Sequence, residues 1–125
     1  MKYKELTHRI IGCAMEVHSA LGNGFQELIY QRSLGLEFDL QKIKYAREVD
    51  VDVFYKGVAV GSRRVDFLIE NKLAVEIKAI KELEDVHLAQ AMNYLEAYNL
   101  EVGLLINFGG RSLEFKRVHN NKKSR

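Results

Sequence analysis

Three charged residues in two short stretches of the sequence have the types and spacing needed for phosphate chemistry. Asp66 lies in one stretch, and Glu76 and Lys78 stand two residues apart in the other. Two carboxylates held close together repel each other unless one is protonated or a cation lies between them. A hard divalent ion meets that need, because magnesium usually takes one or two protein carboxylates together with phosphate oxygens of a substrate. We therefore expect Mg²⁺, or Mn²⁺ in its place, between Asp66 and Glu76.

Lys78 has the chemistry to assist such a site. A cation beside a metal-bound water lowers the pKa of that water or orients it for in-line attack on phosphorus, while the metal stabilises the charge that develops on the phosphate. The reaction indicated is hydrolysis of a phosphodiester by metal-activated water. One Asp and one Glu-x-Lys on neighbouring strands also occur as ordinary solvated charges, and the spacing alone does not decide between the two interpretations.

Strand geometry determines whether these residues can meet. Apolar residues dominate positions 63–69 and 73–79, around a polar turn at 70–72. Alternate residues of a strand share a face. The charged residues would share one face: Arg64 with Asp66, and Glu76 with Lys78. The apolar residues would share the opposite, core-facing side: Val65, Phe67, Ile69, Val75, Ile77 and Ala79.

The hairpin register decides how close the two acids come. If Ile69 pairs with Leu73 across the turn, Asp66 lies opposite Glu76, with the two Cβ atoms about 4.5–5.5 Å apart. A register slipped by one residue would place the acids on opposite faces. The proposed metal pair therefore depends on this register.

The remaining elements follow from periodicity and from turn residues. Apolar residues at helical spacing predict helices over 4–21, from 25 or 26 to 42, and over 85–99, with Gly22 ending the first helix and Asp85 as N-cap of the third. Strands are expected from Tyr45 onward, at the two stretches above, at 102–108 and at 112–118. The nearly all-apolar run 102–108 is typical of a central strand covered on both faces. The predicted class is α/β, with order ααβββαββ and a mixed sheet flanked by helices.

Glu27 is a further candidate. It lies three residues before Tyr30 on the apolar stripe of the second predicted helix. There it could add a third carboxylate to the cluster. Alternatively it is an acid placed near a helix N-terminus, where the helix dipole favours negative charge.

Length and composition favour one soluble domain. The chain has 125 residues, 47% of them hydrophobic, a net charge of +2 and a single cysteine. No apolar run is long enough to span a membrane and no signal-peptide pattern is present, so we expect a cytoplasmic protein with no membrane partner. We assign residues 1–118 to the domain and expect 119–125 to be a disordered basic tail. That tail could instead contact phosphates as a basic arm.

Seven short motifs together resemble a known family. In order they are Gly24-x-x-Glu27-x-x-Tyr30, Tyr55-Lys56-Gly57, Gly61-x-x-Arg64-x-Asp66, Val75-Glu76-Ile77-Lys78-Ala79, His87-x-x-Gln90, Asn93-Tyr94-Leu95 and Gly103 to Gly109. The D…ExK pattern on adjacent strands is similar to that of the PD-(D/E)xK nuclease superfamily, and the first motif resembles the bacterial GxxExxY family within it. The resemblance covers about residues 8–118 and implies a restriction-endonuclease-like fold.

The resemblance also implies roles for individual residues. Asp66 and Glu76 would be metal ligands, with the backbone carbonyl of Ile77 as a further one, Lys78 would be the catalytic lysine and Glu27 an additional acid. Gln90 and Tyr94 resemble the Q-x-x-x-Y helix of recombination-repair exonucleases and would border the site and the nucleic acid. Candidate nucleic-acid contacts are thus Arg64, Gln90 and Tyr94. Ordinary polar residues on a core helix would give the same spacing for the last two.

Three functions remain open from the sequence. The first is a metal-dependent nuclease, acting most simply on DNA. The second is a nucleic-acid-binding or regulatory module that keeps the nuclease fold with little or no turnover. The third is a structural α/β domain whose acids are solvated. A domain of this size has little spare surface for reading bases, so sequence specificity would require a homodimer or a partner protein.

Overall fold

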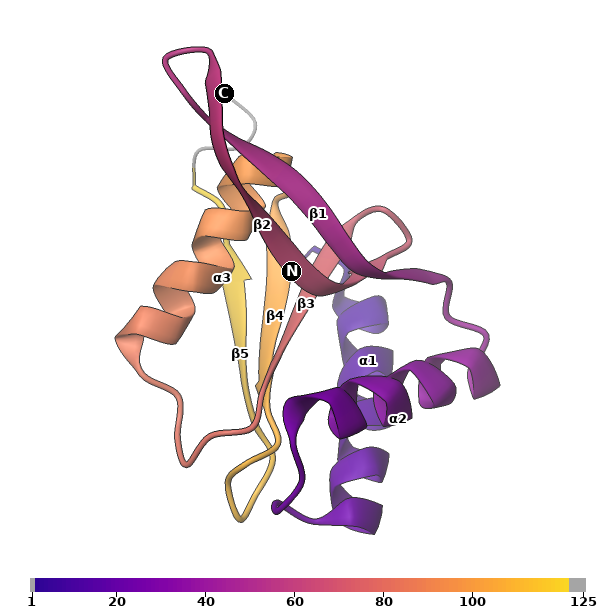
Figure 1. The fold of residues 1–125 in the computed structure, drawn as a ribbon. Coiled ribbons are helices and arrows are strands. Elements are labelled where there is room, and N and C mark those ends of the chain that lie inside the picture. The colour runs from indigo at the N-terminus through magenta and orange to yellow at the C-terminus, as the bar shows by residue number, and fades with distance from the viewer. Residues whose placement is uncertain (1, 122–125) are drawn as a thin grey trace.

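The computed structural model describes residues 2–121 and confirms the predicted order ααβββαββ (Figure 1). Its elements are α1 (Lys4–Leu21), α2 (Glu27–Leu40), β1 (Tyr45–Tyr55), β2 (Val58–Ile69), β3 (Leu73–Lys78), α3 (Asp85–Tyr98), β4 (Val102–Asn107) and β5 (Glu114–His119). Most bounds lie within two residues of those expected from periodicity. The main difference is β2, which begins at Val58 and forms a long hairpin with β1.

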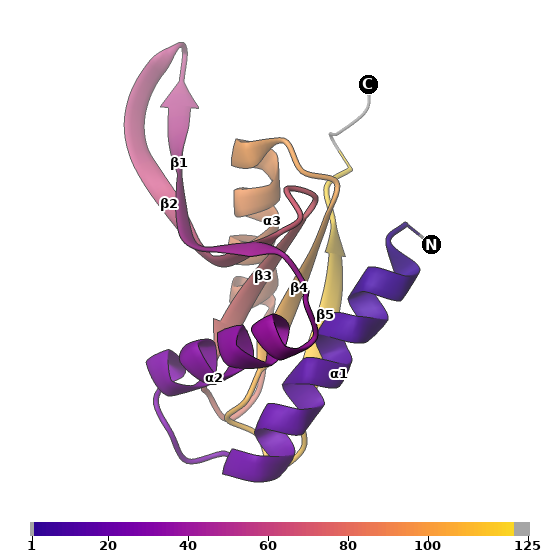
Figure 2. The ribbon, with the colours of Figure 1, turned by 90° about the vertical axis from the view of Figure 1, so that its right-hand side faces the viewer.

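The five strands form one mixed sheet in the order β1-β2-β3-β4-β5. Neighbours are antiparallel except β3 and β4, which run parallel because α3 carries the chain back between them. Helices α1 and α2 cover one face of the sheet and α3 covers the other (Figures 1 and 2). The β1–β2 hairpin extends beyond the ends of the other strands, next to the end of α3.

Each face of the sheet has its own apolar core. Phe67, Val75 and Ile77 pack against α1 and α2, whereas Leu68 and Ala74 pack against α3. All six residues of β4 are buried, which confirms the prediction of a central strand. We had expected a core on one face and charges on the other. That expectation is wrong, because α3 covers the charged face and encloses Glu76, which is only 7% exposed.

The alternation of β2 changes phase at Asp66. Val65 faces the α3 side, yet Phe67, two residues later, faces the α1–α2 side. We predicted that these two residues share a face, and the irregularity explains why they do not. Across the ladder from Asp66, Glu48 of β1 has a positive φ of 56°, a left-handed conformation that breaks the regular pleat. This change in alternation turns the Asp66 side chain toward the opening between β2 and β3.

The connection between α1 and α2 is held by Tyr30. Helix α1 ends at Leu21, and Gly22 takes a positive φ of 75°, as expected for a helix C-terminus. The buried Tyr30 hydroxyl donates to the Gly22 carbonyl at 2.5 Å and accepts the N–H of Phe25 at 3.2 Å. Its ring stacks on Phe108 with centroids 4.7 Å apart. Tyr30 therefore fixes the position from which α2 starts.

Two predicted boundaries need correction. The N-cap of α3 is Glu84, not Asp85, because the backbone N–H of Glu84 donates to His87 Nδ1 at 2.9 Å and closes the first turn one residue earlier. The chain also remains packed past residue 118. The Asn120 side chain is buried and donates to the carbonyls of Leu95 and Leu100. The rest of the predicted basic tail, 122–125, lies outside the described residues.

Within residues 2–121, no helix is both long and apolar enough to cross a bilayer.

Candidate active site

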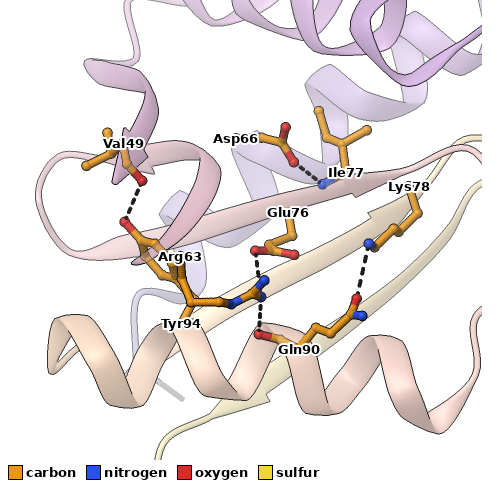
Figure 3. A network of polar contacts seen from close by, with 8 residues as sticks. All are labelled: Val49, Arg63, Asp66, Glu76, Ile77, Lys78, Gln90 and Tyr94. Atoms are coloured by element: carbon orange, nitrogen blue, oxygen red, sulfur yellow. Dashed lines mark hydrogen bonds and ion pairs between the residues drawn. The ribbon is translucent and has the colours of Figure 1, made fainter. Parts of the chain in front are cut away.

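The candidate site lies where β2 and β3 separate. The predicted hairpin register is confirmed at Ile69–Leu73, Leu68–Ala74 and Phe67–Val75. The ladder ends there, so the predicted strand pair between Asp66 and Glu76 does not form. Beyond the last pair the Asp66 side chain replaces the ladder, and its Oδ2 accepts the backbone N–H of Ile77 at 2.7 Å (Figure 3). The N–H and C=O of one strand residue point to the same side, so the Ile77 carbonyl faces this gap as well.

A glutamine on α2 orients the Asp66 carboxylate. The buried Gln31 donates from Nε2 to Asp66 Oδ1 at 2.8 Å. Asp66 is thus held through both oxygens, by the backbone of β3 on one side and by α2 on the other. The remaining acceptor capacity of each oxygen is free for a further ligand, because a carboxylate offers about four lone-pair positions.

Glu76 is buried and incompletely paired. Its nearest cation is Arg63 of β2, whose Nη2 lies 3.7 Å from Glu76 Oε1. That separation is too long for a hydrogen bond, and Oε1 has no hydrogen-bond partner among the described residues. A buried carboxylate oxygen without a partner is costly. A cation bound at Glu76 Oε1 would therefore offset this free-energy cost.

Helix α3 closes the other side of the site. The Nζ of Lys78 donates to Gln90 Oε1 at 3.2 Å, and Arg63 Nη2 donates to the Gln90 carbonyl at 2.7 Å. In Figure 3 the Arg63 guanidinium lies between Glu76 and the backbone of α3. Gln90 thus contacts both basic residues of the site, and its place beside a metal ion stays a prediction.

Burial sets the acidity of the two central carboxyls. It raises the pKa of Asp66 above its ordinary value, against the opposing effects of the Ile77 N–H, the Gln31 amide and Lys78. It also raises the pKa of Glu76, where Arg63 opposes the shift and the Asp66 charge adds to it. Protons and a bound cation would therefore compete for these two carboxylates.

Glu27 lies at the edge of this group. It is the first residue of α2 and is exposed, because the buried stripe that it was expected to share begins only at Tyr30. Partial burial nevertheless raises the pKa of its carboxyl, with Lys78 opposing and Asp66 reinforcing the shift. In the described part of the chain, no group of three or more His, Cys, Asp or Glu is placed to hold a metal ion. Glu27 is thus an electrostatic neighbour of the site and not a third member of a closed carboxylate cluster.

Two other candidates lie elsewhere. Arg64 is exposed on β2 and forms a bidentate pair with Asp50 of β1, at 2.9 and 3.1 Å. Tyr94 is fully buried, donates its hydroxyl to the Val49 carbonyl at 3.3 Å and stacks on Tyr98. Burial raises the pKa of Tyr94 to about 12. In this arrangement Tyr94 links α3 to β1 and presents no surface to a nucleic acid.

Sequence reasoning missed Gln31 and Arg63. Gln31 follows Glu27 by four residues, so the two share one face of α2, and that spacing could have indicated it. Arg63 gave no comparable signal. Strict alternation from Asp66 places Arg63 on the opposite face, and only the phase change at Asp66 brings its side chain to Glu76.

A buried asparagine fixes the chain directly after Lys78. The Asn107 Oδ1 accepts the N–H groups of Ile80 and Gly109, while its Nδ2 donates to the Ile80 carbonyl and to Glu114 Oε1, all at 3.0 Å. Gly109 is required here, since a Cβ would lie 2.2 Å from the Ile80 oxygen. The motif around Asn107 and Gly109 therefore anchors the loop that leads from Lys78 to α3.

The donor set fits a hard divalent cation. Asp66 and Glu76 offer carboxylate oxygens, and magnesium usually takes one or two carboxylates from a protein. Two buried oxygens, Glu76 Oε1 and Gln31 Oε1, have no hydrogen-bond partner among residues 2–121. Buried polar atoms without partners are rare and call for an explanation. A cation held between these side chains would satisfy Glu76 Oε1.

Comparison with known proteins identifies the family. A sequence model of the PD-(D/E)XK nuclease superfamily matches residues 4–118. The chain therefore belongs to this superfamily, whose members generally use divalent metal ions. A search of curated protein sequences finds no match.

Two solved structures share the fold. An alkaline exonuclease, LHK-Exo from Laribacter hongkongensis, superposes with a TM-score of 0.58 at 6% identity, over 98% of this chain and 73% of that one. The crystal structure of SSO0001 superposes with a TM-score of 0.53 at 18% identity, over 92% of this chain. This chain spans only 65% of SSO0001. The mixed sheet with flanking helices is thus the restriction-endonuclease-like fold predicted from the sequence.

Proposed function

We propose that the protein is a magnesium- or manganese-dependent nuclease that hydrolyses phosphodiester bonds, with DNA as the expected substrate. The observation that carries the proposal is the buried Glu76 carboxylate, whose Oε1 has no hydrogen-bond partner in the described chain, beside Asp66. The motif Gly24-x-x-Glu27-x-x-Tyr30 supports membership of the GxxExxY group. When bound, the divalent ion would activate water and stabilise charge on the phosphate.

Each residue of the site has a separate proposed role, which follows from its position. Asp66 and Glu76 would hold the ion, and the Ile77 carbonyl, on the same side of β3, would add a further oxygen. Gln31 orients Asp66, and Gln90 holds the Lys78 ammonium at 3.2 Å. Lys78 would then direct its charge toward the attacking water or the phosphate oxygens. Glu27 would contribute negative charge at the entrance without completing a three-carboxylate cluster.

A cleavage panel tests this proposal. Single- and double-stranded DNA and RNA are each incubated with Mg²⁺ or Mn²⁺ and with wild type or Glu76→Gln. We expect cleavage of at least one DNA form by wild type, and its loss in Glu76→Gln with circular dichroism unchanged. Cleavage that persists unchanged in Glu76→Gln would assign the activity to another site or to a contaminant.

The alternative is a nucleic-acid-binding module without turnover. It predicts that no polymer is cut with either metal, although the folded protein still binds nucleic acid. A homodimer remains a separate expectation, based on the small surface of one domain. Sedimentation at the concentrations used for cleavage tests it, and cutting of a defined sequence by a monomer would contradict it.

A further inference from the structure

A groove lies between the β1–β2 hairpin and α3, next to the candidate site. Its volume is about 430 Å³, near the lower end of the roughly 300–1,000 Å³ typical of small-molecule pockets. Its lining includes Asp52, Phe54, Arg63, Asn93 and Glu96. The size suits one ring system with its sugar and not a duplex.

The groove is continuous with the site through shared residues. Arg63 lines the groove, and the Nη2 of the same side chain lies 3.7 Å from Glu76 Oε1. On α3, Gln90 contacts Lys78, and Asn93 lies three residues further along the same face. A strand whose phosphate lies at Lys78 would therefore pass toward this groove, where another nucleotide of the same strand would bind.

The lining favours a base over a phosphate. Asp52 and Glu96 are acidic and repel a phosphate, but carboxylates accept hydrogen bonds from the amino groups of bases. The Asn93 amide can both donate and accept. Phe54 is 63% exposed although it is a large aromatic residue, and an exposed ring beside polar groups is the usual platform for stacking a base.

The hairpin is distorted at this position. The register between β1 and β2 shifts between Val53 and Phe54. Such bulges bend a strand and change the direction of a side chain, and they are common next to active sites. The shift places Phe54 on the groove, whereas Tyr55, which is equally exposed, does not line it.

We propose that this groove binds a single unpaired base of the nucleic acid strand, stacked on Phe54 and read by Asn93, Asp52 and Glu96. The proposal rests on the nuclease function above and narrows its substrate to single-stranded or locally unpaired DNA. In a duplex the faces of each base are covered by the neighbouring base pairs, so a base can stack on Phe54 only where it is unpaired.

Binding of a labelled DNA single strand tests the groove independently of cleavage. Fluorescence anisotropy in EDTA measures affinity for wild type, Phe54→Ala and the matched control Tyr55→Ala. An abasic nucleotide, which keeps its phosphate and lacks its base, is moved along the strand. We expect wild type to lose about tenfold in affinity at one position. Phe54→Ala should lose a similar factor with the intact strand and show no further loss with the abasic one.

The salt dependence of binding gives a second readout. Phe54 contacts no phosphate in this proposal, so Phe54→Ala should leave the slope of log affinity against log salt unchanged. Equal losses in Phe54→Ala and Tyr55→Ala, or an abasic nucleotide that has no effect anywhere, would overturn the proposal. Tighter binding of a matched duplex than of the single strand would overturn it as well.

The two proposals can fail separately. Metal-dependent cleavage by a protein that is insensitive to abasic sites would retain the nuclease and remove the base groove. Position-dependent abasic losses in a protein that cuts no polymer would retain the groove and remove the nuclease.

Discussion

The Asp66 carboxylate accepts the backbone N–H of Ile77 at 2.7 Å, at the point where β2 leaves β3. This bond replaces the ladder pair that a regular hairpin would form there. It places one acid directly over the strand that carries Glu76 and Lys78. The separation of the two strands thus creates the opening of the site, and the same hydrogen bond fixes one of the two acids at that opening.

Replacement of Gln31 should weaken metal binding more than it changes the fold. Gln31→Leu removes the 2.8 Å hydrogen bond that orients Asp66. Loss of such an orienting partner typically costs about 10–100-fold in metal affinity. Titration of Mn²⁺ by calorimetry measures the change. Gln41→Ala, an exposed glutamine after α2, is the control, and equal affinities of the two variants would contradict the orienting role.

The two adjacent arginines of β2 should respond differently to truncation. Arg63→Ala leaves the buried Glu76 without its nearest cation and leaves the Gln90 carbonyl without its donor. We expect this to lower the free energy of unfolding of the metal-free protein by about 1–3 kcal/mol. Arg64→Ala removes only an exposed pair with Asp50 and should change stability little. Urea unfolding in EDTA tests this, and similar losses for both variants would refute the distinction.

The metal-free protein should become less stable as pH rises above the ordinary carboxyl range. Burial holds the folded pKa of Asp66 and Glu76 above the unfolded values, so the folded state binds more protons in that window. The stability of the metal-free protein therefore falls as pH rises through this window. Glu76→Gln removes the ionisable carboxyl and with it the part of this loss that Glu76 causes. We therefore expect the variant to be more stable than wild type at neutral pH in EDTA. Thermal unfolding against pH measures this.

The control for that series is Glu5→Gln, which changes an exposed carboxyl on α1. Its pH profile should follow wild type. Addition of Mg²⁺ should raise the melting temperature of wild type most at neutral pH, because protons compete for the same carboxylates at lower pH. A wild-type protein whose stability in EDTA rises with pH through this range would contradict the assignment.

Loss of the Asn107 side chain should destabilise the whole domain. Asn107→Ala removes four hydrogen bonds and leaves the Ile80 N–H and carbonyl without their partner. The expected cost is about 2–4 kcal/mol, since each unsatisfied buried group costs about 1–3 kcal/mol and the loop can relax in part. Asn93→Ala, on the exposed face of α3, should stay within about 0.5 kcal/mol. Equal urea unfolding midpoints for Asn107→Ala and Asn93→Ala would show that the Asn107 hydrogen bonds do not stabilise the domain.

Local patterns in the sequence predict the fold well. The helix period around Ile10 and Val17, the Gly22 turn and the apolar run from Val102 each reflect an interaction within a few residues, so periodicity locates them. The hairpin register was also predictable, because the turn at 70–72 permits Ile69 to pair with Leu73. These features depend on local geometry that every strand or helix obeys.

The details of the site depend on longer-range effects. The positive φ of Glu48 lies across from Asp66 and changes which face of the sheet the β2 side chains point to. A glutamate gives no indication in the sequence that its φ will be positive. That change explains why Arg63, and not Arg64, reaches Glu76. It likewise explains why Asp66 meets Gln31 from a helix far away in the chain. The candidate trio of Asp66, Glu76 and Lys78 could be proposed from its residue types, whereas the side chains that contact it could not.

Lys78→Met provides the sharpest test of the proposed hydrolytic centre. Cleavage of the best substrate from the panel is measured at saturating Mn²⁺, beside Mn²⁺ affinity by calorimetry, for wild type and for this variant. We predict that the cleavage rate falls about 100-fold or more, while Mn²⁺ binding at Asp66 and Glu76 is retained. A Lys78→Met protein that cleaves at the wild-type rate with wild-type metal affinity would show that this trio is not the catalytic centre.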